Sequence, residues 1–348
     1  MKILVLALSG IGDALMFTPA LKLLRQSLPT ARIDALVMYK GTKEIYGQNP
    51  DLTDVIHFDF LNEGAVKSLK FVLSIRKKYD ATINVYPSNR KEYNIINFLI
   101  GAKQRAGVRY LRMDFQNLSW LNNVTVLEND ETHNVQTNIK LIEKLLNKNF
   151  AEEPAMQISL SESDKLFAKN FLKENNIYEN DFVVGFHPGC ATLKNHIKRR
   201  WEPDKFAGLG KKLLKENNAK ILLFGGPEEE ALKLSIKEKI GSENSFIIKT
   251  EKFLQSIAIM ERCNVFITND SALMHVASAL GLKVIAIIGP TNPRYIHPWK
   301  TDHKIVSLNL ECAPCFFYSP KPLTCTRTDV QFKCIKELDI DLVMDNIF

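Results

Sequence analysis

Asp13 follows two glycines in the stretch SGIGDAL, where an apolar run ends and a segment with helical spacing begins. Glycine allows a tight turn in which the backbone approaches a ligand closely, and the dipole of the new helix favours an ionised carboxylate in its first turn. An ionised carboxylate placed there can accept a proton from a substrate hydroxyl. The alternative is that Asp13 only caps the helix, an interaction worth about 1 kcal/mol.

A second helix start carries groups that suit a phosphate. Asp270 and Ser271 follow the strand-like run NVFIT, and His275 lies one helical turn later on a similar face. Unpaired backbone amides at a helix N-terminus, together with the Ser271 hydroxyl, form a seat for a phosphate or diphosphate. His275 taken alone also fits a packed, hydrogen-bonded histidine.

Two further loops carry charge. Lys198, Arg199 and Arg200 stand beside Trp201 in the long loop after the run FVVGF, where a cation can neutralise a leaving diphosphate. A solvated surface and a nucleic-acid contact are the other interpretations of this cluster. The three glutamates at 228–230 follow FGGP and begin a helix. Their ordinary role is solvated capping, and one of them, aimed into a cleft, could bind ribose hydroxyls.

The glycines of the first loop also resemble the start of a dinucleotide-binding fingerprint. Leu15 stands where that fingerprint needs a third small residue, and residues 38–40, at the end of the second strand, include no acid. Both departures weigh against an oxidoreductase that uses a nicotinamide or flavin.

The chain has no zinc-protease motif, Walker A loop or serine-nucleophile elbow. The acidic triplet at 339–341 falls in an expected C-terminal helix, so a metal-bound nucleotide is not indicated.

Strand and helix patterns alternate through both halves of the chain and must position these loops. Continuous apolar runs are typical of strands buried on both faces, and amphipathic helical segments separate them. The expected strands are 3–8, 33–38, 54–58 and 81–86, then 182–186, 220–224, 245–249, 264–268 and 283–288. We expect an α/β protein with two doubly wound parallel sheets, joined between about 155 and 182. The loops at the carboxyl ends of the strands should face one cleft between the two domains.

Length and composition are consistent with this plan. The chain has 348 residues, 45% of them hydrophobic and 24% charged, enough for two domain cores. The net charge of +7 suits an anionic ligand, a membrane surface, nucleic acid or simply a lysine-rich surface. The apolar start resembles a secretion signal, but Gly10, Gly12 and Asp13 interrupt it and a mixed-charge helix follows, so we expect no signal peptide. No run of about 18 apolar residues indicates a membrane span.

Six segments in order resemble the bacterial heptosyltransferases of glycosyltransferase family 9. They are SGIGDALMFTPALKLLRQSLP, HPG, KRRWEP, FGGPEEE, TNDSALMHVASALG and GPTNP. The resemblance implies a GT-B architecture of two Rossmann-like domains facing a central cleft. We expect an acceptor-binding domain over 1–165 and a nucleotide-sugar-binding domain over 166–348, with the last helix packing back on the first. The implied reaction is inverting transfer of heptose from ADP-heptose to the inner core of lipopolysaccharide, with no cofactor and no metal.

The resemblance assigns roles residue by residue. The catalytic base falls on Asp13, and the cation for the leaving group falls on Lys198 or Arg199. The family usually has Lys-x-Trp-Pro in that loop, whereas here Arg199 occupies the lysine position and Glu202 displaces the proline. The assigned donor-binding residues are Gly189, Glu229, Asp270, Ser271, Ala272 and His275, with Glu228 the alternative to Glu229. The resemblance names no acceptor residues. The candidates for acceptor binding are Gly12 and, because their charges suit acceptor phosphates or carboxylates, Arg90 and Arg105.

The remaining expectations concern cysteines and partners. Cys312, Cys315, Cys325 and Cys334 crowd the C-terminal region. The last two are too widely spaced for an ordinary four-cysteine zinc site, so we expect reduced thiols, with a structural metal as the alternative. The expected partners are a nucleotide-sugar donor and an anionic glycolipid acceptor, with no nucleic acid. We expect a cytoplasmic monomer that contacts the inner membrane peripherally. A noncatalytic nucleotide-sugar-binding protein is the alternative function.

Overall fold

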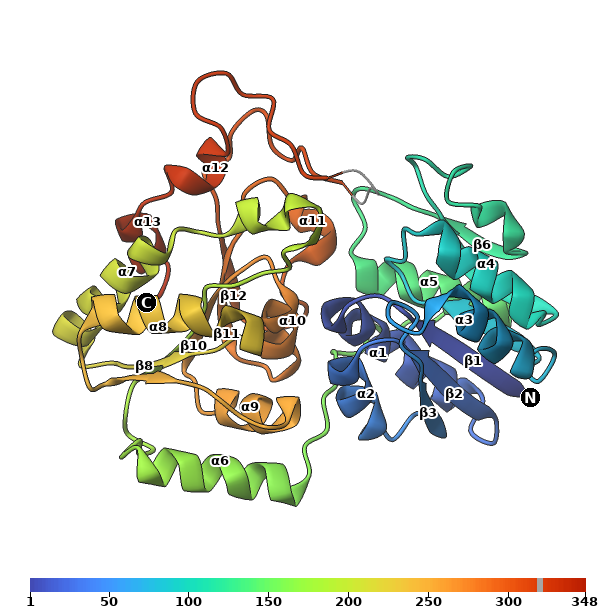
Figure 1. Cartoon of the computed structure of the whole chain (residues 1–348), viewed down its shortest axis with the longest axis horizontal. Helices are drawn as coiled ribbons and strands as arrows, with labels where there is room; N and C mark the ends of the chain where they lie inside the picture. The colour runs from blue at the N-terminus through green and yellow to red at the C-terminus, as the bar shows by residue number, and fades with distance from the viewer. Residues whose placement is uncertain (318–321) are drawn as a thin grey trace. The chain divides into compact units, whose positions relative to one another are not determined.

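The computed structural model describes residues 1–317 and 322–348. Its contacts divide the chain into two compact units, which we call unit 1, residues 1–159, and unit 2, residues 160–317 and 322–348. Each unit has its own six-stranded parallel sheet with helices packed against it (Figure 1). The α/β class and the doubly wound parallel sheets predicted from the alternating pattern are therefore confirmed.

Unit 1 has the strand order β3-β2-β1-β4-β5-β6. Its strands are β1 (Lys2–Ala7), β2 (Arg32–Val37), β3 (Asp54–His57), β4 (Ala81–Asn84), β5 (Gln104–Arg109) and β6 (Val124–Leu127). Its helices are α1 (Ile11–Ser27), α2 (Lys40–Gly47), α3 (Gly64–Ser74), α4 (Lys91–Ile100), η1 (Ser119–Leu121) and α5 (Asn134–Leu146). The order reverses between β1 and β4, so the loops after these strands are neighbours. The Ser9 hydroxyl donates to the Pro87 carbonyl at 2.7 Å across this point.

The first apolar run forms the central strand of unit 1. Leu4 and Leu6 of β1 belong to a core cluster that packs beneath α3 and α4 and includes Val72 and Ile100. Helix α3 ends at Ser74. Lys77 takes a positive φ of 58° and its amide donates to the Ile100 carbonyl at 2.7 Å, which turns the chain toward β4.

Unit 2 has the strand order β12-β11-β10-β7-β8-β9. Its strands are β7 (Val183–His187), β8 (Lys220–Leu223), β9 (Ser245–Ile247), β10 (Val265–Asn269), β11 (Lys283–Ile287) and β12 (His303–Val306). Its longer helices are α6 (Glu162–Glu174), α7 (Pro203–Asn217), α8 (Glu230–Ile240), α9 (Phe253–Met260) and α10 (Ala272–Ala279). Shorter helical segments are η2 (Leu193–Arg199), η3 (Pro227–Glu229), α11 (Pro293–Ile296), α12 (Lys333–Lys336) and α13 (Ile340–Met344).

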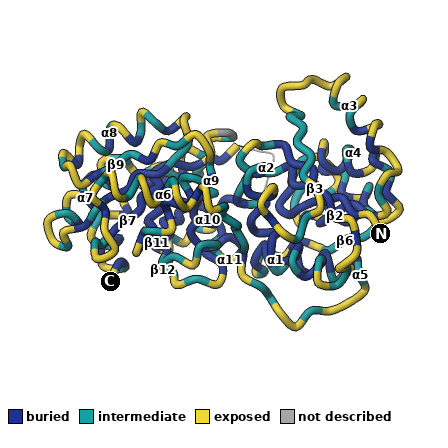
Figure 2. The backbone as a smooth tube through the Cα atoms, turned by 90° about the horizontal axis from the view of Figure 1, so that it is seen from below, coloured by how far each residue is buried: buried dark blue, intermediate teal, exposed yellow. Residues whose placement is uncertain are grey.

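The core of unit 2 gathers around β7 and β10. Phe186, Trp201, Phe206 and Ile267 are fully buried, and Trp201 donates through Nε1 to the Leu338 carbonyl at 2.8 Å. In Figure 2 the central strands of both units are coloured as buried, and the helices around them are more exposed. α13 packs on α7 within unit 2. None of the helices in the described part of the chain is long and apolar enough to cross a membrane.

Candidate active site

The carboxyl ends of three neighbouring strands bring the predicted donor-binding loops of unit 2 together. β7 lies between β8 and β10, and the sheet order reverses between β7 and β10. The loop after β7 carries the basic cluster, the loop after β8 carries Glu229, and α10 begins directly after β10. Ligands of open parallel sheets bind outside such a reversal point.

His187, the last residue of β7, joins two of these loops. Its Nδ1 lies 2.8 Å from the Ser271 hydroxyl, and its Nε2 lies 3.1 Å from Glu229 Oε2. All three side chains are buried. The Ser271 hydroxyl also lies 3.1 Å from the Thr268 hydroxyl, so the position of Ser271 is defined by two side chains of the sheet.

Glu229 accepts further hydrogen bonds inside unit 2. The Gly226 amide donates to Oε2 at 3.2 Å, and Arg200 Nη2 donates to Oε1 at 3.0 Å. Burial alone would raise the pKa of Glu229, but the His187 hydrogen bond and the Arg200 charge outweigh it and the pKa is lowered. Glu229 is therefore a buried, ionised carboxylate. Glu228 is exposed instead.

Gly189 lies directly against that carboxylate. A Cβ atom built at Gly189 would stand 1.7 Å from Glu229 Oε1. Any side chain at position 189 would have to displace the Glu229 carboxylate. The carboxylate can occupy its position because residue 189 is a glycine.

Asp270 connects the basic loop to the start of α10. Its Oδ2 accepts a hydrogen bond from Arg199 Nη1 and a second one from the Thr291 hydroxyl, at 2.6 Å. The Arg199 guanidinium is buried and lies over the Phe316 ring, 5.5 Å from its centroid. Of the two cations assigned to the leaving group, Arg199 is thus fixed beside α10, whereas Lys198 is exposed.

The first turn of α10 is not capped by its own N-cap side chain. Ser271 occupies the N-cap position, but its hydroxyl contacts His187 and Thr268 instead of the helix amides. The helix proper begins at Ala272, so the early amides of α10 can receive an anion.

His275 lies one turn into α10 and is buried. Burial lowers its pKa to about 4, so the ring is neutral at physiological pH. Its Nδ1 has no hydrogen-bond partner among the residues that the structure describes. A neutral histidine at this position is either a core residue or a hydrogen-bonding group for a ligand.

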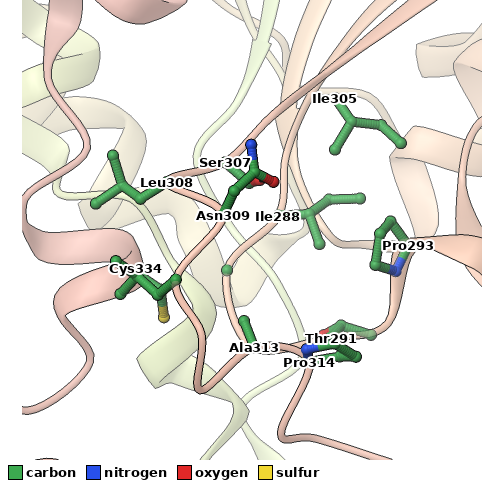
Figure 3. Close-up of a pocket in the computed structure, with 12 residues that line it drawn as sticks. Ile288, Thr291, Pro293, Ile305, Ser307, Leu308, Asn309, Ala313, Pro314 and Cys334 are labelled. Carbon is green, nitrogen blue, oxygen red and sulfur yellow. The ribbon is translucent and has the colours of Figure 1, made fainter.

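A pocket lies beside the loop that carries Thr291. Figure 3 shows Thr291 beside Ala313 and Pro314, with Pro293 to one side of them and Cys334 to the other. Because the Thr291 hydroxyl donates to Asp270, this pocket and the start of α10 share one residue as a boundary.

In unit 1, Asp13 is the third residue of α1 and is partly exposed. The Gly10 amide donates to its Oδ2 at 3.1 Å, so the capping contact considered from the sequence is present. Burial raises the pKa of Tyr39, the Arg90 charge lowers it and the Asp13 charge raises it further. Asp13 and Arg90 therefore lie close enough to act on the same tyrosine. Gly12 is buried in the first turn of α1.

Arg105 is not brought to this place. It is the second residue of β5, at the amino end of the parallel sheet, whereas Asp13 lies beyond the carboxyl end of β1. Its guanidinium donates to the carbonyls of Leu121 and Ala102 at 3.0 and 2.9 Å. These contacts join the chain just before β5 to the end of η1, so the guanidinium of Arg105 is used within unit 1.

The cysteine-rich region is described except for residues 318–321. All six thiols are free of disulfides. Burial and the charges of Cys315, Cys325 and Cys312 raise the pKa of Cys334 to about 11. In the described part of the chain no group of three or more His, Cys, Asp and Glu side chains is arranged to hold a metal ion.

Sequence reasoning missed three residues of the site: His187, Thr291 and the particular role of Arg200. The signal for His187 was available, because a histidine ending a fully apolar strand must find polar partners at the sheet edge. Thr291 lies in the segment GPTNP, which carries the family resemblance but predicts no role for any of its residues.

A family model describing glycosyltransferase family 9 (heptosyltransferase) matches residues 68–323. The chain belongs to this family. It is 25% identical over 321 residues to lipopolysaccharide heptosyltransferase 2 of Escherichia coli, with 88% of each chain covered.

Two solved structures share the fold of this family 9 protein. E. coli ADP-heptose lps heptosyltransferase II has a TM-score of 0.71 at 21% identity, with 99% of both chains covered. E. coli heptosyltransferase WaaC with ADP has a TM-score of 0.66 at 20% identity, covering 88% of this chain and 92% of that one. The GT-B-like fold expected from the resemblance is confirmed.

Proposed function

We propose that this family 9 protein is an inverting, metal-independent glycosyltransferase that moves heptose from ADP-heptose to an inner-core lipopolysaccharide-type acceptor. The family match and the relative named lipopolysaccharide heptosyltransferase 2 support the reaction class. The solved heptosyltransferase with ADP, which has the same fold, supports the nucleotide.

The observation that carries the proposal is the arrangement around α10 in unit 2. A helix N-terminus whose N-cap hydroxyl is turned to His187 lies beside the buried Arg199–Asp270 pair. Helix amides and an adjacent guanidinium are the groups that stabilise a departing diphosphate. In this proposal residues 166–348 bind the donor and residues 1–165 bind the acceptor.

The proposed chemistry is a direct displacement. Asp13 takes the proton of an acceptor hydroxyl while that oxygen bonds to the anomeric carbon and the bond from that carbon to the diphosphate oxygen breaks. ADP leaves as an anion held by the early amides of α10, with Arg199 or Lys198 offsetting its charge. Inversion follows because the attacking oxygen enters opposite the leaving group.

Glu229 is proposed to contact the ribose of ADP. A carboxylate offers about four acceptor positions. His187 and the Gly226 amide use Oε2 and Arg200 uses Oε1, which leaves room on Oε1 for one ribose hydroxyl.

The test is acceptor-dependent release of ADP. The purified protein is incubated with ADP-heptose and with a lipopolysaccharide acceptor that lacks its inner-core heptoses, and ADP is quantified with and without acceptor. We expect release only when both substrates are present, with heptose recovered on the acceptor. Binding of ADP-heptose without transfer to any inner-core acceptor would favour the noncatalytic binding protein instead.

A further inference from the structure

Lys233 is a buried lysine that the proposed chemistry does not use. It lies near the start of α8, four residues after Glu229, and is 3% exposed. Its Nζ donates to the carbonyls of Gly225 and Ile248, each at 3.0 Å. Burial lowers the pKa of Lys233, and the Glu229 charge is the largest of the charges that raise it again. Because burying an ammonium is costly, these partners must hold it in place.

The two carbonyls come from the ends of neighbouring strands. Gly225 lies two residues beyond β8, and Ile248 directly follows β9, which pairs with β8 in parallel. Lys233 therefore ties the start of α8 to the chain beyond both strands. This is the same edge of the unit 2 sheet at which Glu229 contacts His187.

The peptide that joins Gly225 to Gly226 is held from both sides. Its carbonyl oxygen accepts from Lys233 Nζ, and its N–H donates to Glu229 Oε2 at 3.2 Å. The C=O and N–H of a trans peptide point in opposite directions, so one peptide unit lies between the ammonium and the carboxylate. Turning this peptide over would break both hydrogen bonds at once.

The two glycines leave the orientation of this peptide to its hydrogen bonds. Gly225 has a φ of 153°, which side chains disfavour, and a Cβ there would stand 2.6 Å from Glu229 Oε2. Glycine satisfies both conditions, but it also allows the chain other conformations. The orientation must therefore come from the groups that bind the peptide, and Lys233 is the group on its carbonyl side.

We propose that Lys233 is a positioning residue that orients the peptide between Gly225 and Gly226 and, through its N–H, the carboxylate of Glu229. Lys233 acts through this peptide and not by contact with the nucleotide. The consequence for binding rests on the proposed function, in which Oε1 of Glu229 accepts from a ribose hydroxyl. A carboxylate already held in one orientation binds that hydroxyl with less loss of conformational freedom.

The first test follows the peptide itself, in the protein without nucleotide. Lys233→Met removes the ammonium and keeps an unbranched side chain. Hydrogen exchange of the Gly226 amide is measured in glycine-labelled protein, relative to Gly210, a buried glycine of α7. We expect the ratio of the two exchange rates to rise at least about tenfold, since the peptide is then free to leave Glu229. An unchanged ratio in folded Lys233→Met would overturn the proposal.

Two other variants of α8 separate positioning from a general loss of stability. Lys237→Met makes the same substitution one turn further along, at a partly exposed residue. Ile236→Ala removes contacts from the core of unit 2 and should lower the melting temperature. Neither variant should raise the exchange of Gly226 relative to Gly210. A rise in either one equal to that in Lys233→Met would show that the lysine does not orient the peptide.

The second test compares binding of ADP and 2′,3′-dideoxy-ADP by calorimetry. The parent should bind ADP at least about tenfold more tightly, because only ADP offers ribose hydroxyls to a charged carboxylate. Lys233→Met should lose most of this preference and bind 2′,3′-dideoxy-ADP like the parent. The proposal is overturned if the variant weakens both nucleotides equally or keeps the parental preference. If Lys233→Met frees the Gly226 amide but the parent binds both nucleotides equally, the ribose role of Glu229 is wrong and the positioning of the peptide stands.

Discussion

The Nδ1 atom of His187 lies 2.8 Å from the hydroxyl of Ser271, and the opposite ring nitrogen lies 3.1 Å from the Glu229 carboxylate. The His187 ring thus contacts both Ser271, the N-cap residue of α10, and Glu229, the residue proposed to bind ribose. Because it touches both from the end of a central strand, His187 is a positioning residue in the proposed donor site.

Replacing His187 should weaken binding of ADP more than binding of adenosine. His187→Ala leaves Ser271 and Glu229 without a buried partner, and the loss of such hydrogen bonds costs about 1–3 kcal/mol. We therefore expect ADP affinity, measured by calorimetry, to fall at least about fivefold. His187→Asn can keep the Ser271 contact and should retain more ADP affinity than alanine. Unchanged ADP affinity in His187→Ala would remove the positioning role.

Gly189→Ala should destabilise unit 2 and weaken donor binding. The new Cβ meets Glu229 Oε1 at 1.7 Å, so the carboxylate must leave its contacts with His187 and Arg200. Overpacking of this kind costs about 1–3 kcal/mol. Gly47→Ala is the control, since nothing lies within 4 Å of a Cβ at Gly47. Equal denaturation midpoints for the two variants would show that the Glu229 position is not fixed.

Asp270→Asn should cost about 3–5 kcal/mol of unfolding free energy, because it leaves the buried Arg199 guanidinium without its counter-charge. Asp341→Asn breaks an exposed pair with Lys212 and should cost less than about 1 kcal/mol. Urea denaturation of both variants measures the difference. Similar losses of unfolding free energy in the two variants would mean that the Arg199–Asp270 pair is exposed to solvent.

Acid should destabilise the protein partly through His275. The pKa of His275 falls from 6.5 to about 4 on folding because of burial. The unfolded state therefore binds the proton first, and stability is lost as pH falls from 6.5 through 4, by up to about 3 kcal/mol. His275→Gln should lose correspondingly less stability over this interval. Parallel pH profiles of parent and variant would contradict the burial of a neutral ring.

The sequence predicted the sheets better than it predicted the contacts of the site. Runs such as residues 3–8 are apolar because their strands are buried on both faces, and that composition is readable without knowing the strand order. The helix start at Ser271 was likewise readable from local spacing.

The link from His187 to Glu229 was not readable in this way. These residues are 42 positions apart, and they meet because β8 pairs with β7. The place of Arg105 was not readable for a related reason, since only the register of β5 shows that it lies at the amino end of the sheet. Local composition reveals which segments are buried, but contacts between loops depend on the order of the strands.

The central claim is that Asp13 acts as the base, and Asp13→Asn tests it most directly. Asparagine can still accept the Gly10 amide, so folding and ADP affinity should be retained. Asp164→Asn is the matched control, because Asp164 holds the same third position of α6 and accepts the Ser161 amide at the same 3.1 Å.

The deciding measurement is the rate of acceptor-dependent ADP release by the two variants. The account predicts that Asp13→Asn lowers kcat at least about 100-fold while Asp164→Asn turns over like the parent. Parental turnover by folded Asp13→Asn would contradict it.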